Sequence, residues 1–339
     1  MANISDYKIA TIGSHTALQI LKGAKDEGFQ TVCVCQRGRE RVYQSYNVAD
    51  EYILYDNLKA EYDEIEKKLI EMNAIIIPHG SFVSELGHQR VKQTNVMYYG
   101  DKAILEWESD RNMEREWLTK ADLKLPRIFK SHEEIDRPCI VKFHGAHGGK
   151  GYFIANNPEE FVERKKQYKG DDDYVIQEYI VGVPLYVHYF YSPVNDELEI
   201  MSFDKRYESN ADSIGRIAAQ DQIHANIQTS YTIAGNIPLV LRESLLPKFF
   251  EMGDNVVKSS REIVDRGLFG SFCLEGIIDP NLNYYVFEIS ARIVAGTNPF
   301  VNGSPYTWLR YDVPMSTGRR IALDIKQAIE QDKIDLILT

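Results

Sequence analysis

Two glutamates in the last third of the chain, Glu275 and Glu288, have a spacing that could hold a metal ion. They lie in the apolar segments 271–279 and 284–291, which predict the two strands of a hairpin. If the register continues unbroken from a short turn, the glutamates face each other across the strands, where like charges destabilise a sheet. A divalent cation such as Mg²⁺ removes that penalty, because it prefers oxygen ligands. A register shifted by one would put one glutamate on each face, but apolar neighbours on both faces favour the metal interpretation.

A glycine-rich segment follows the predicted strand 139–143 and could bind phosphate. Glycines let backbone N–H groups come close to a phosphate, and neighbouring lysines supply positive charge. The spacing differs from that of a Walker A loop, and a second predicted strand, 152–155, follows, which indicates a flap between two strands. The alternative is a hairpin tip that binds nothing. The residues concerned are Lys142, Gly145, Gly148, Gly149, Lys150 and Gly151.

Polar turns end two apolar segments in the first hundred residues. The predicted strands 7–12 and 74–77 are followed by Gly-Ser-His-Thr at 13–16 and Pro-His-Gly-Ser at 78–81. In a parallel sheet, ligands bind beyond the carboxyl ends of the strands, and the start of the next helix favours an anion such as a phosphate. From the residues alone, an ordinary turn residue is the better interpretation of His15.

The elements that carry these residues divide the chain into two parts. A strand at 7–12, a helix at 17–28 and a strand at 31–35 form a βαβ unit, so the first 110 or so residues predict a doubly wound α/β domain. Beyond Pro126, strands follow one another closely, which predicts an α+β arrangement. These strands are expected at 139–143, 152–155, 174–179, 185–191 and 198–204, with a helix at about 243–264 and a last helix capped by Ser316 or Thr317.

Length and charge restrict the function. The chain has 339 residues, enough for two or three domains. Its net charge of −11 argues against a nucleic-acid polymer as partner. Apolar runs are too short for a membrane span, the N-terminus does not read as a secretory signal, and the four cysteines form no CxxC pair. These features predict a cytoplasmic protein that acts on small molecules.

Taken together, the segments resemble the ATP-grasp superfamily over nearly the whole chain. The order is an α/β domain, a helix that ends before Pro126, the flap, a hinge-like segment at 176–182 (Ile-Gln-Glu-Tyr-Ile-Val-Gly) and two late carboxylates. The resemblance implies a Rossmann-like, pre-ATP-grasp α/β domain over residues 1–118. It also implies two α+β ATP-grasp subdomains, a small one with the flap over 119–184 and a large one with the metal site over 185–339.

Finer motifs resemble the archaeal formate-dependent FAICAR synthetases, the PurP family. They lie at residues 13–16, 78–81, 204–210, 235–238, 287–292 and 297–306. The resemblance implies a ligase that formylates the amine of the ribotide AICAR (5-aminoimidazole-4-carboxamide ribonucleotide) in purine synthesis. ATP would activate formate as formyl phosphate, and ADP would be released. The implied partners are therefore ATP, formate and AICAR, with a homo-oligomer as a further possibility.

The resemblance also implies roles for individual residues. Catalytic roles fall on Arg292 and Lys142, and the metal, Mg²⁺ or Mn²⁺, falls on Glu275 and Glu288. Substrate contacts fall on Ser14, His15, Thr16, Ser81, Asn236 and Asn298. ATP contacts fall on Lys142, Gly145, Gly148, Gly149, Lys150, Gly151, Glu178, Tyr179, Ile180 and Glu208.

Two alternatives remain open at the level of the sequence. Many ATP-grasp proteins have Asn two residues after the second metal carboxylate, where this chain has Ser290. One alternative is an ATP-grasp ligase that joins another acid to the amine of a different ribotide. The other is a nucleotide-binding paralogue without catalytic activity, although the intact pair of glutamates argues against it.

Overall fold

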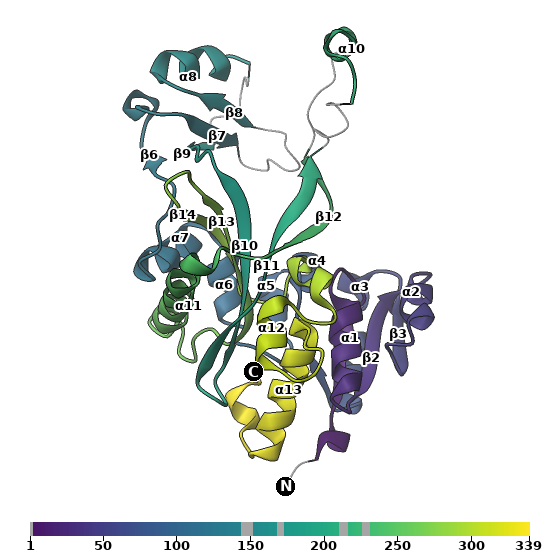
Figure 1. Cartoon of the computed structure of the whole chain (residues 1–339). Helices are drawn as coiled ribbons and strands as arrows, with labels where there is room; N and C mark the ends of the chain where they lie inside the picture. Colours follow the sequence, from purple (N-terminus) through teal and green to yellow (C-terminus); the bar gives the residue numbers. More distant parts are fainter. Residues whose placement is uncertain (1–2, 144–151, 168–172, 210–215, 226–230) are drawn as a thin grey trace.

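The computed structural model describes residues 3–143, 152–167, 173–209, 216–225 and 231–339. The described strands form three sheets (Figure 1). The first sheet is parallel throughout, in the order β3-β2-β1-β4-β5, as the alternation of strands and helices predicts. Its strands are β1 (Lys8–Ile12), β2 (Gln30–Gln36), β3 (Glu51–Tyr55), β4 (Ala74–Ile76) and β5 (Met97–Tyr98).

Short helices connect and extend this first sheet. The buried face of α1 carries Ile20, Leu21 and Ala24, which follow a helical spacing and pack into the core. The helices are α1 (Ala17–Asp26), α2 (Glu40–Ser45), α3 (Leu58–Glu71), α4 (Gly80–Leu86), α5 (His88–Lys92), α6 (Ile104–Ser109) and α7 (Arg111–Lys120).

A small antiparallel sheet follows, with α8 (Pro158–Lys165) packed on it. Phe161 of α8 and Phe153 of the sheet belong to its separate hydrophobic core. In Figure 1 this sheet lies above the large sheet. Its order is β6-β9-β7-β8, with strands β6 (Ile128–Phe129), β9 (Tyr174–Glu178), β7 (Cys139–Phe143) and β8 (Tyr152–Ala155).

The large sheet is antiparallel and holds the strands expected to carry the metal site. The helix α11 (Leu246–Ser260) packs on it and is shorter at both ends than the expected 243–264. The strand order is β12-β11-β10-β13-β14, with β12 (Tyr231–Leu239), β11 (Glu197–Ser209), β10 (Val183–Ser192), β13 (Gly270–Ile278) and β14 (Tyr284–Ser290). The remaining elements are α10 (Ala219–Ala225), α12 (Pro305–Arg310), α13 (Thr317–Glu330), η1 (Ile4–Asp6), η2 (His132–Glu134), η3 (Glu243–Leu245), η4 (Ala295–Phe300) and η5 (Ile334–Leu336).

The end of the chain returns to the first sheet. Helix α13 packs against α1 so closely that a Cβ at Gly23 would lie 2.3 Å from the backbone nitrogen of Arg319. The last residue, Thr339, exchanges two backbone hydrogen bonds with Tyr98 of β5, at 2.9 and 3.1 Å. The Oγ of Ser316 accepts a hydrogen bond from the nitrogen of Arg319, so Ser316 is the N-cap of α13. The first and last parts of the sequence therefore form one packed unit.

Candidate active site

The two glutamates expected to hold a metal are opposed across β13 and β14. Their pairing is confirmed, but the unbroken register was wrong. Ile278, not Asp279, pairs with Tyr284, because Asp279 closes the turn by accepting hydrogen bonds from the backbone N–H groups of Asn281 and Asn283. A bulge between Glu275 and Gly276 then restores the expected pairing of Glu275 with Glu288.

Burial of Glu275 makes its ionised form electrostatically costly. Glu275 is only 4% exposed, and burial, with the negative charge of Glu288 as the next cause, raises its pKa to about 8. Nη2 of Arg206 lies 2.6 Å from Oε1 of Glu275 and opposes that rise. Two opposed oxygen donors fit Mg²⁺, which takes one or two protein carboxylates and completes its coordination with phosphates and water. The described residues contain no cluster of three or more His, Cys, Asp or Glu side chains that could hold a metal.

Two further glutamates, not expected from the sequence, hold β14 in place. This strand is at the edge of the sheet, so its outer N–H groups need other partners. Oε1 of Glu114 accepts from the nitrogen of Ile289 at 2.7 Å, and Oε2 of Glu108 accepts from the nitrogen of Ala291 at 3.0 Å. Burial raises the pKa of Glu114 to about 8. No spacing in the sequence connects these residues of α6 and α7 with a strand 175 or more positions later.

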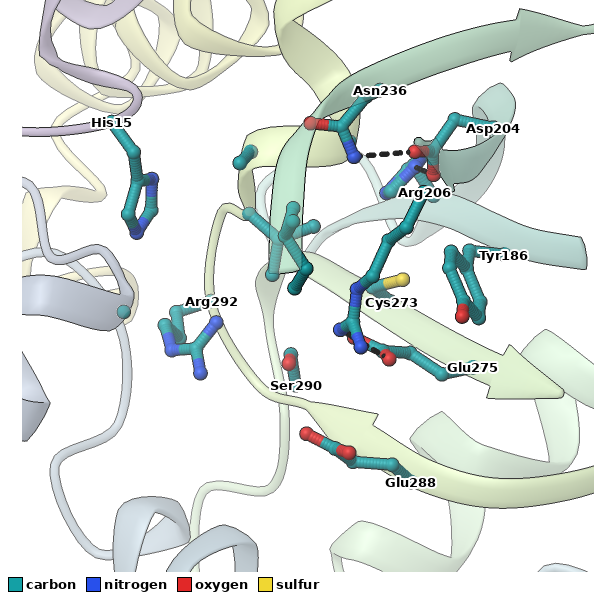
Figure 2. Close-up of a pocket in the computed structure, with 16 residues that line it drawn as sticks. His15, Tyr186, Asp204, Arg206, Asn236, Cys273, Glu275, Glu288, Ser290 and Arg292 are labelled. Carbon is teal, nitrogen blue, oxygen red and sulfur yellow. Dashed lines mark hydrogen bonds and ion pairs between the residues drawn. The ribbon is translucent and has the colours of Figure 1, made fainter. Parts of the chain in front are cut away.

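One pocket brings together residues from both ends of the chain, and we call it the His15 pocket (Figure 2). His15 and Gly80 come from the ends of the first sheet, Arg206 and Asn236 from β11 and β12. The pocket also contains Glu275 of β13, Glu288 and Ser290 of β14, and Arg292 of the turn after β14. The pocket therefore contains the predicted substrate residues His15 and Asn236 together with the predicted metal ligands and Arg292.

His15 is uncharged near neutral pH in this setting. Burial, and then the positive charge of Arg292, lowers its pKa to about 4. Its ring lies 4.8 Å from that of His79, whose Nε2 is 2.8 Å from the carbonyl oxygen of Ile12. His15 is therefore suited to a hydrogen bond with a ligand, and the cation beside it is Arg292. Nη2 of Arg292 is 2.8 Å from Oε1 of Glu108, while its buried Nε has no hydrogen-bond partner among the described residues.

The other predicted substrate residues surround the turn that carries His15 and are absent from the pocket lining. The hydroxyl oxygens of Ser14 and Ser81 lie 2.7 Å apart and join the two strand ends. Asn298 is hydrogen-bonded to the carbonyl oxygen of His15 and accepts from Gln19 at 2.8 Å, so it fixes the turn. Thr16 is buried, and its hydroxyl has no hydrogen-bond partner in the described part of the chain.

A second cavity, which we call the Lys142 cavity, lies between the small sheet and β14. Lys142 lines it with its Nζ 3.3 Å from Oε1 of Gln177, and burial, followed by the charge of Arg111, lowers the pKa of Lys142. Glu288 lines this cavity as well as the His15 pocket. A ligand in the Lys142 cavity would therefore reach the carboxylates that face the other pocket.

The remaining predicted ATP residues line neither of these cavities or lie outside the described residues. Glu178 ends β9, and its side chain is hydrogen-bonded to Arg127 and Arg137. The nitrogen of Tyr179 donates to the carbonyl oxygen of Pro138, and Ile180 follows directly. Glu208 is half-buried on β11. The predictions for Gly145, Gly148, Gly149, Lys150 and Gly151 fall outside the described residues.

Comparison with solved structures assigns the fold. The structure is similar to an IMP biosynthesis protein PurP from Thermococcus kodakaraensis, with a TM-score of 0.76, 27% identity and coverage of 98% of this chain and 100% of that chain. It is also similar to N5-carboxyaminoimidazole synthetase from Staphylococcus aureus complexed with ADP, with a TM-score of 0.64, 17% identity and coverage of 96% and 79%. The fold and site thus define an ATP-grasp protein.

Sequence comparison then gives the family. Profiles described as a protein of unknown function (DUF1246) and a domain of unknown function (DUF1297) match residues 9–129 and 157–339. The chain is 54% identical to a relative from Pyrococcus abyssi, over 98% of both chains, and 55% identical to one from Thermococcus kodakarensis, over 98% of this chain and all of the relative. Both are named 5-formaminoimidazole-4-carboxamide-1-(beta)-D-ribofuranosyl 5'-monophosphate synthetase. The chain belongs to this synthetase family, PurP, and is an ATP-dependent ligase by class. No described helix is long and apolar enough to cross a membrane.

Proposed function

We propose that this chain is the ADP-forming ligase that formylates the amine of AICAR to FAICAR with ATP and formate in IMP synthesis. Its relatives, which align with it over nearly their whole length, are named as synthetases of that product. The observation that carries the proposal is the position of Glu288, which lines both the His15 pocket and the Lys142 cavity. A phosphoryl donor in one space and an acceptor in the other would meet at this carboxylate.

The ribotide would occupy the His15 pocket. His15 and Asn236 are polar lining groups that can contact its uncharged atoms, with Ser14, Thr16, Ser81 and Asn298 shaping the adjoining turn. Arg292 would take the anionic group, formate or the charge that develops on it, because its buried Nε has no partner among the described residues. An arginine in a water-poor pocket stabilises such a charge strongly.

ATP would occupy the Lys142 cavity. Lys142 would neutralise phosphate charge, the segment 178–180 and Glu208 would bind the nucleoside part, and the glycines of 145–151 would cover the phosphates. Glu275 and Glu288 would hold Mg²⁺ or Mn²⁺, which supplies positive charge to the phosphates when bound.

The reaction needs the chain mainly for position and charge. Formate attacks the γ-phosphorus of ATP through one oxygen, ADP leaves, and formyl phosphate forms. The amine nitrogen of AICAR then attacks the formyl carbon, phosphate leaves, and the nitrogen loses one proton. Holding both reactants in order and neutralising the phosphate charge would accelerate transfer, and excluding water would protect the mixed anhydride from hydrolysis.

Several broader properties belong to the same proposal. Residues 1–118 would form a Rossmann-like substrate domain, 119–184 the small ATP-grasp subdomain and 185–339 the large one. The protein would act in the cytoplasm, and a homo-oligomer is compatible with exposed Trp308 and Leu309, which are 65% and 87% exposed.

The decisive experiment measures ADP release with ATP and Mg²⁺ while formate and AICAR are added singly and together. We expect release only when both are present, and a formylated product in equal amount. If ADP release does not depend on AICAR but increases with another ribotide, the protein is a different ligase. Binding of ATP and AICAR without any ADP would indicate a nucleotide-binding paralogue.

A further inference from the structure

Three side chains that line the His15 pocket form a hydrogen-bonded series, and two of them, His188 and Asp204, have no role in the proposed function. Nε2 of His188 lies 2.7 Å from Oδ1 of Asp204, and both side chains are 1% exposed. The other carboxylate oxygen of Asp204 accepts a 2.7 Å hydrogen bond from Nδ2 of Asn236. The three residues come from β10, β11 and β12, so the series crosses the sheet to its edge.

Asp204 decides which end of the Asn236 amide faces the ligand. A carboxylate only accepts hydrogen bonds, so both of its neighbours must present N–H groups to it. The amide nitrogen of Asn236 is therefore directed at Asp204. Figure 2 shows the amide oxygen turned away from Asp204, toward the side of the pocket on which His15 lies. The pocket thus receives a hydrogen-bond acceptor at this position.

The packing around Asp204 leaves it little freedom. A Cβ at Gly296 would lie 2.4 Å from Oδ1 of Asp204 and 2.6 Å from Cε1 of His188, so the backbone of η4 covers the pair directly. A buried polar pair of this kind contributes little to stability compared with apolar residues of similar size. Its geometry, in contrast, fixes the orientation of a side chain that lines the pocket.

We propose that Asp204, held by His188, is a positioning residue that presents Oδ1 of Asn236 as an acceptor for an N–H group of the ribotide. The site then favours ligands that donate a hydrogen bond at this point. The proposal rests on the proposed function only where it names the ribotide. The amine and the carboxamide of AICAR both carry such N–H groups, so the chemistry required is an N–H donor.

The test reverses the polarity of the series. In Asp204→Asn, the new amide oxygen accepts from Nε2–H of His188, and its nitrogen then faces the nitrogen of Asn236. The opposite arrangement would move the proton of His188 to Nδ1, which is buried with no partner among the described residues, and so would leave an unpaired N–H group. We therefore expect the amide of Asn236 to turn over, which places a donor against the donor of the ligand. We expect the Kd for AICAR, measured by calorimetry, to rise about tenfold or more, because a polar group left unpaired in a pocket discriminates strongly. The KM for ATP should stay the same.

The double variant Asp204→Asn with Asn236→Asp should rescue binding. Asn at 204 then donates to Asp at 236, whose second oxygen again accepts from the ligand. We expect the Kd to return to within about threefold of the wild-type value, on the same scale of single hydrogen bonds. A role in stability alone would not produce this rescue. Ser202→Ala is the matched control, because Ser202 is buried on the same strand and its hydroxyl has no partner among the described residues.

Each result bears on a different claim. Wild-type protein that binds no AICAR refutes the proposed function. AICAR binding that is equally tight in the wild type and in a folded Asp204→Asn variant refutes only the positioning role, as does a double variant no better than the single one. If Asp204→Asn does not fold, Asn236→Leu decides, since it keeps the size of the side chain at a half-buried position but removes the acceptor. Unchanged AICAR affinity in that variant would overturn the inference.

Discussion

Two clusters of charged side chains, both in contact with the large sheet, differ in how completely they are paired and buried. The first, the site carboxylates, consists of Glu108, Glu114, Glu275 and Glu288. Glu108 pairs with Arg292 and Glu275 with Arg206, while Glu114 and Glu288 have no ion pair within the described residues. The second, the Arg320 cluster, consists of Arg320, Glu199, Asp324, Tyr99 and Ser192.

The Arg320 cluster satisfies its charges internally. Nε of Arg320 lies 2.7 Å from Glu199 and Nη1 lies 3.4 Å from Asp324. The two oxygens of Asp324 also accept from Tyr99 at 3.0 Å and from Ser192 at 2.5 Å. Because Tyr99 follows the first sheet and Arg320 belongs to α13, this cluster ties both ends of the chain to the large sheet. Paired buried charge serves the architecture, whereas the site carboxylates outnumber the cations of the chain that pair with them, as the proposed metal site requires.

The largest expected effect concerns Glu288, a site carboxylate that has no ion pair within the described residues. Glu288→Gln should reduce the turnover number about a thousandfold. The variant loses a carboxylate proposed to hold the metal, and with it the positive charge that stabilises the reacting phosphate groups. Steady-state ADP release with ATP, formate and AICAR measures this reduction, and the melting temperature should change little. Glu197→Gln is the control, since Glu197 is on the same sheet and 47% exposed. Near-normal turnover in Glu288→Gln would contradict the metal role.

The next largest effect concerns Arg320, the buried cation of the Arg320 cluster. Arg320→Met should lower the free energy of unfolding by about 3 kcal/mol, because Glu199 and Asp324 lose their buried cation. Urea unfolding measures this, and turnover per folded molecule should be retained. Arg310→Met is the matched control, since Arg310 contacts the same Glu199 but is 40% exposed and should cost at most about 1 kcal/mol. Equal losses in the two variants would show that the buried position of Arg320 does not make its pairing more important than that of Arg310.

A pH series tests the electrostatic cost of the site without any ligand. The folded protein keeps the proton of Glu275 up to about pH 8, whereas an ordinary glutamate loses it near pH 4.5. The folded state therefore binds more protons between these values, so Glu275 lowers stability as the pH rises through this window. The melting temperature of Glu275→Gln, relative to wild type, should increase from pH 5 to pH 8. In Glu197→Gln this difference should be flat, because Arg310 lowers the pKa of Glu197.

The smallest effect concerns the helix that carries the paired cluster. Ser316→Ala removes the N-cap of α13 and should cost about 1 kcal/mol of unfolding free energy. Ser316→Asp keeps a capping oxygen and should stay within a few tenths of a kcal/mol of wild type. Urea unfolding would detect a cost of the alanine variant. An equal loss in both variants would show that the cap does not stabilise α13.

The sequence alone determined what depends on local pattern. Alternating strands and helices predicted the parallel first sheet, the hairpin predicted that Glu275 and Glu288 are opposed, and Ser316 was recognised as a possible cap. These features depend on neighbours within a few residues or on one tight turn, so spacing suffices to find them. Even there, the bulge beside Glu275 came from the way Asp279 closes the turn. Four of the described strands, β3, β5, β6 and β12, were missed. β12 contains Pro238, which an edge strand tolerates.

Only the tertiary structure decided which distant residues meet. His15 faces Arg292, Asn236 is directed by Asp204, and Glu108 and Glu114 hold an edge strand far along the chain. The same holds for the charge balance, since whether a glutamate is paired depends on elements that pack against it from elsewhere. Periodicity says which face of a strand or helix is buried, but the partner of a buried polar group is set by the packing of whole elements. In this chain the opposition of Glu275 and Glu288 was therefore readable from the sequence, and the charged groups that surround them were not.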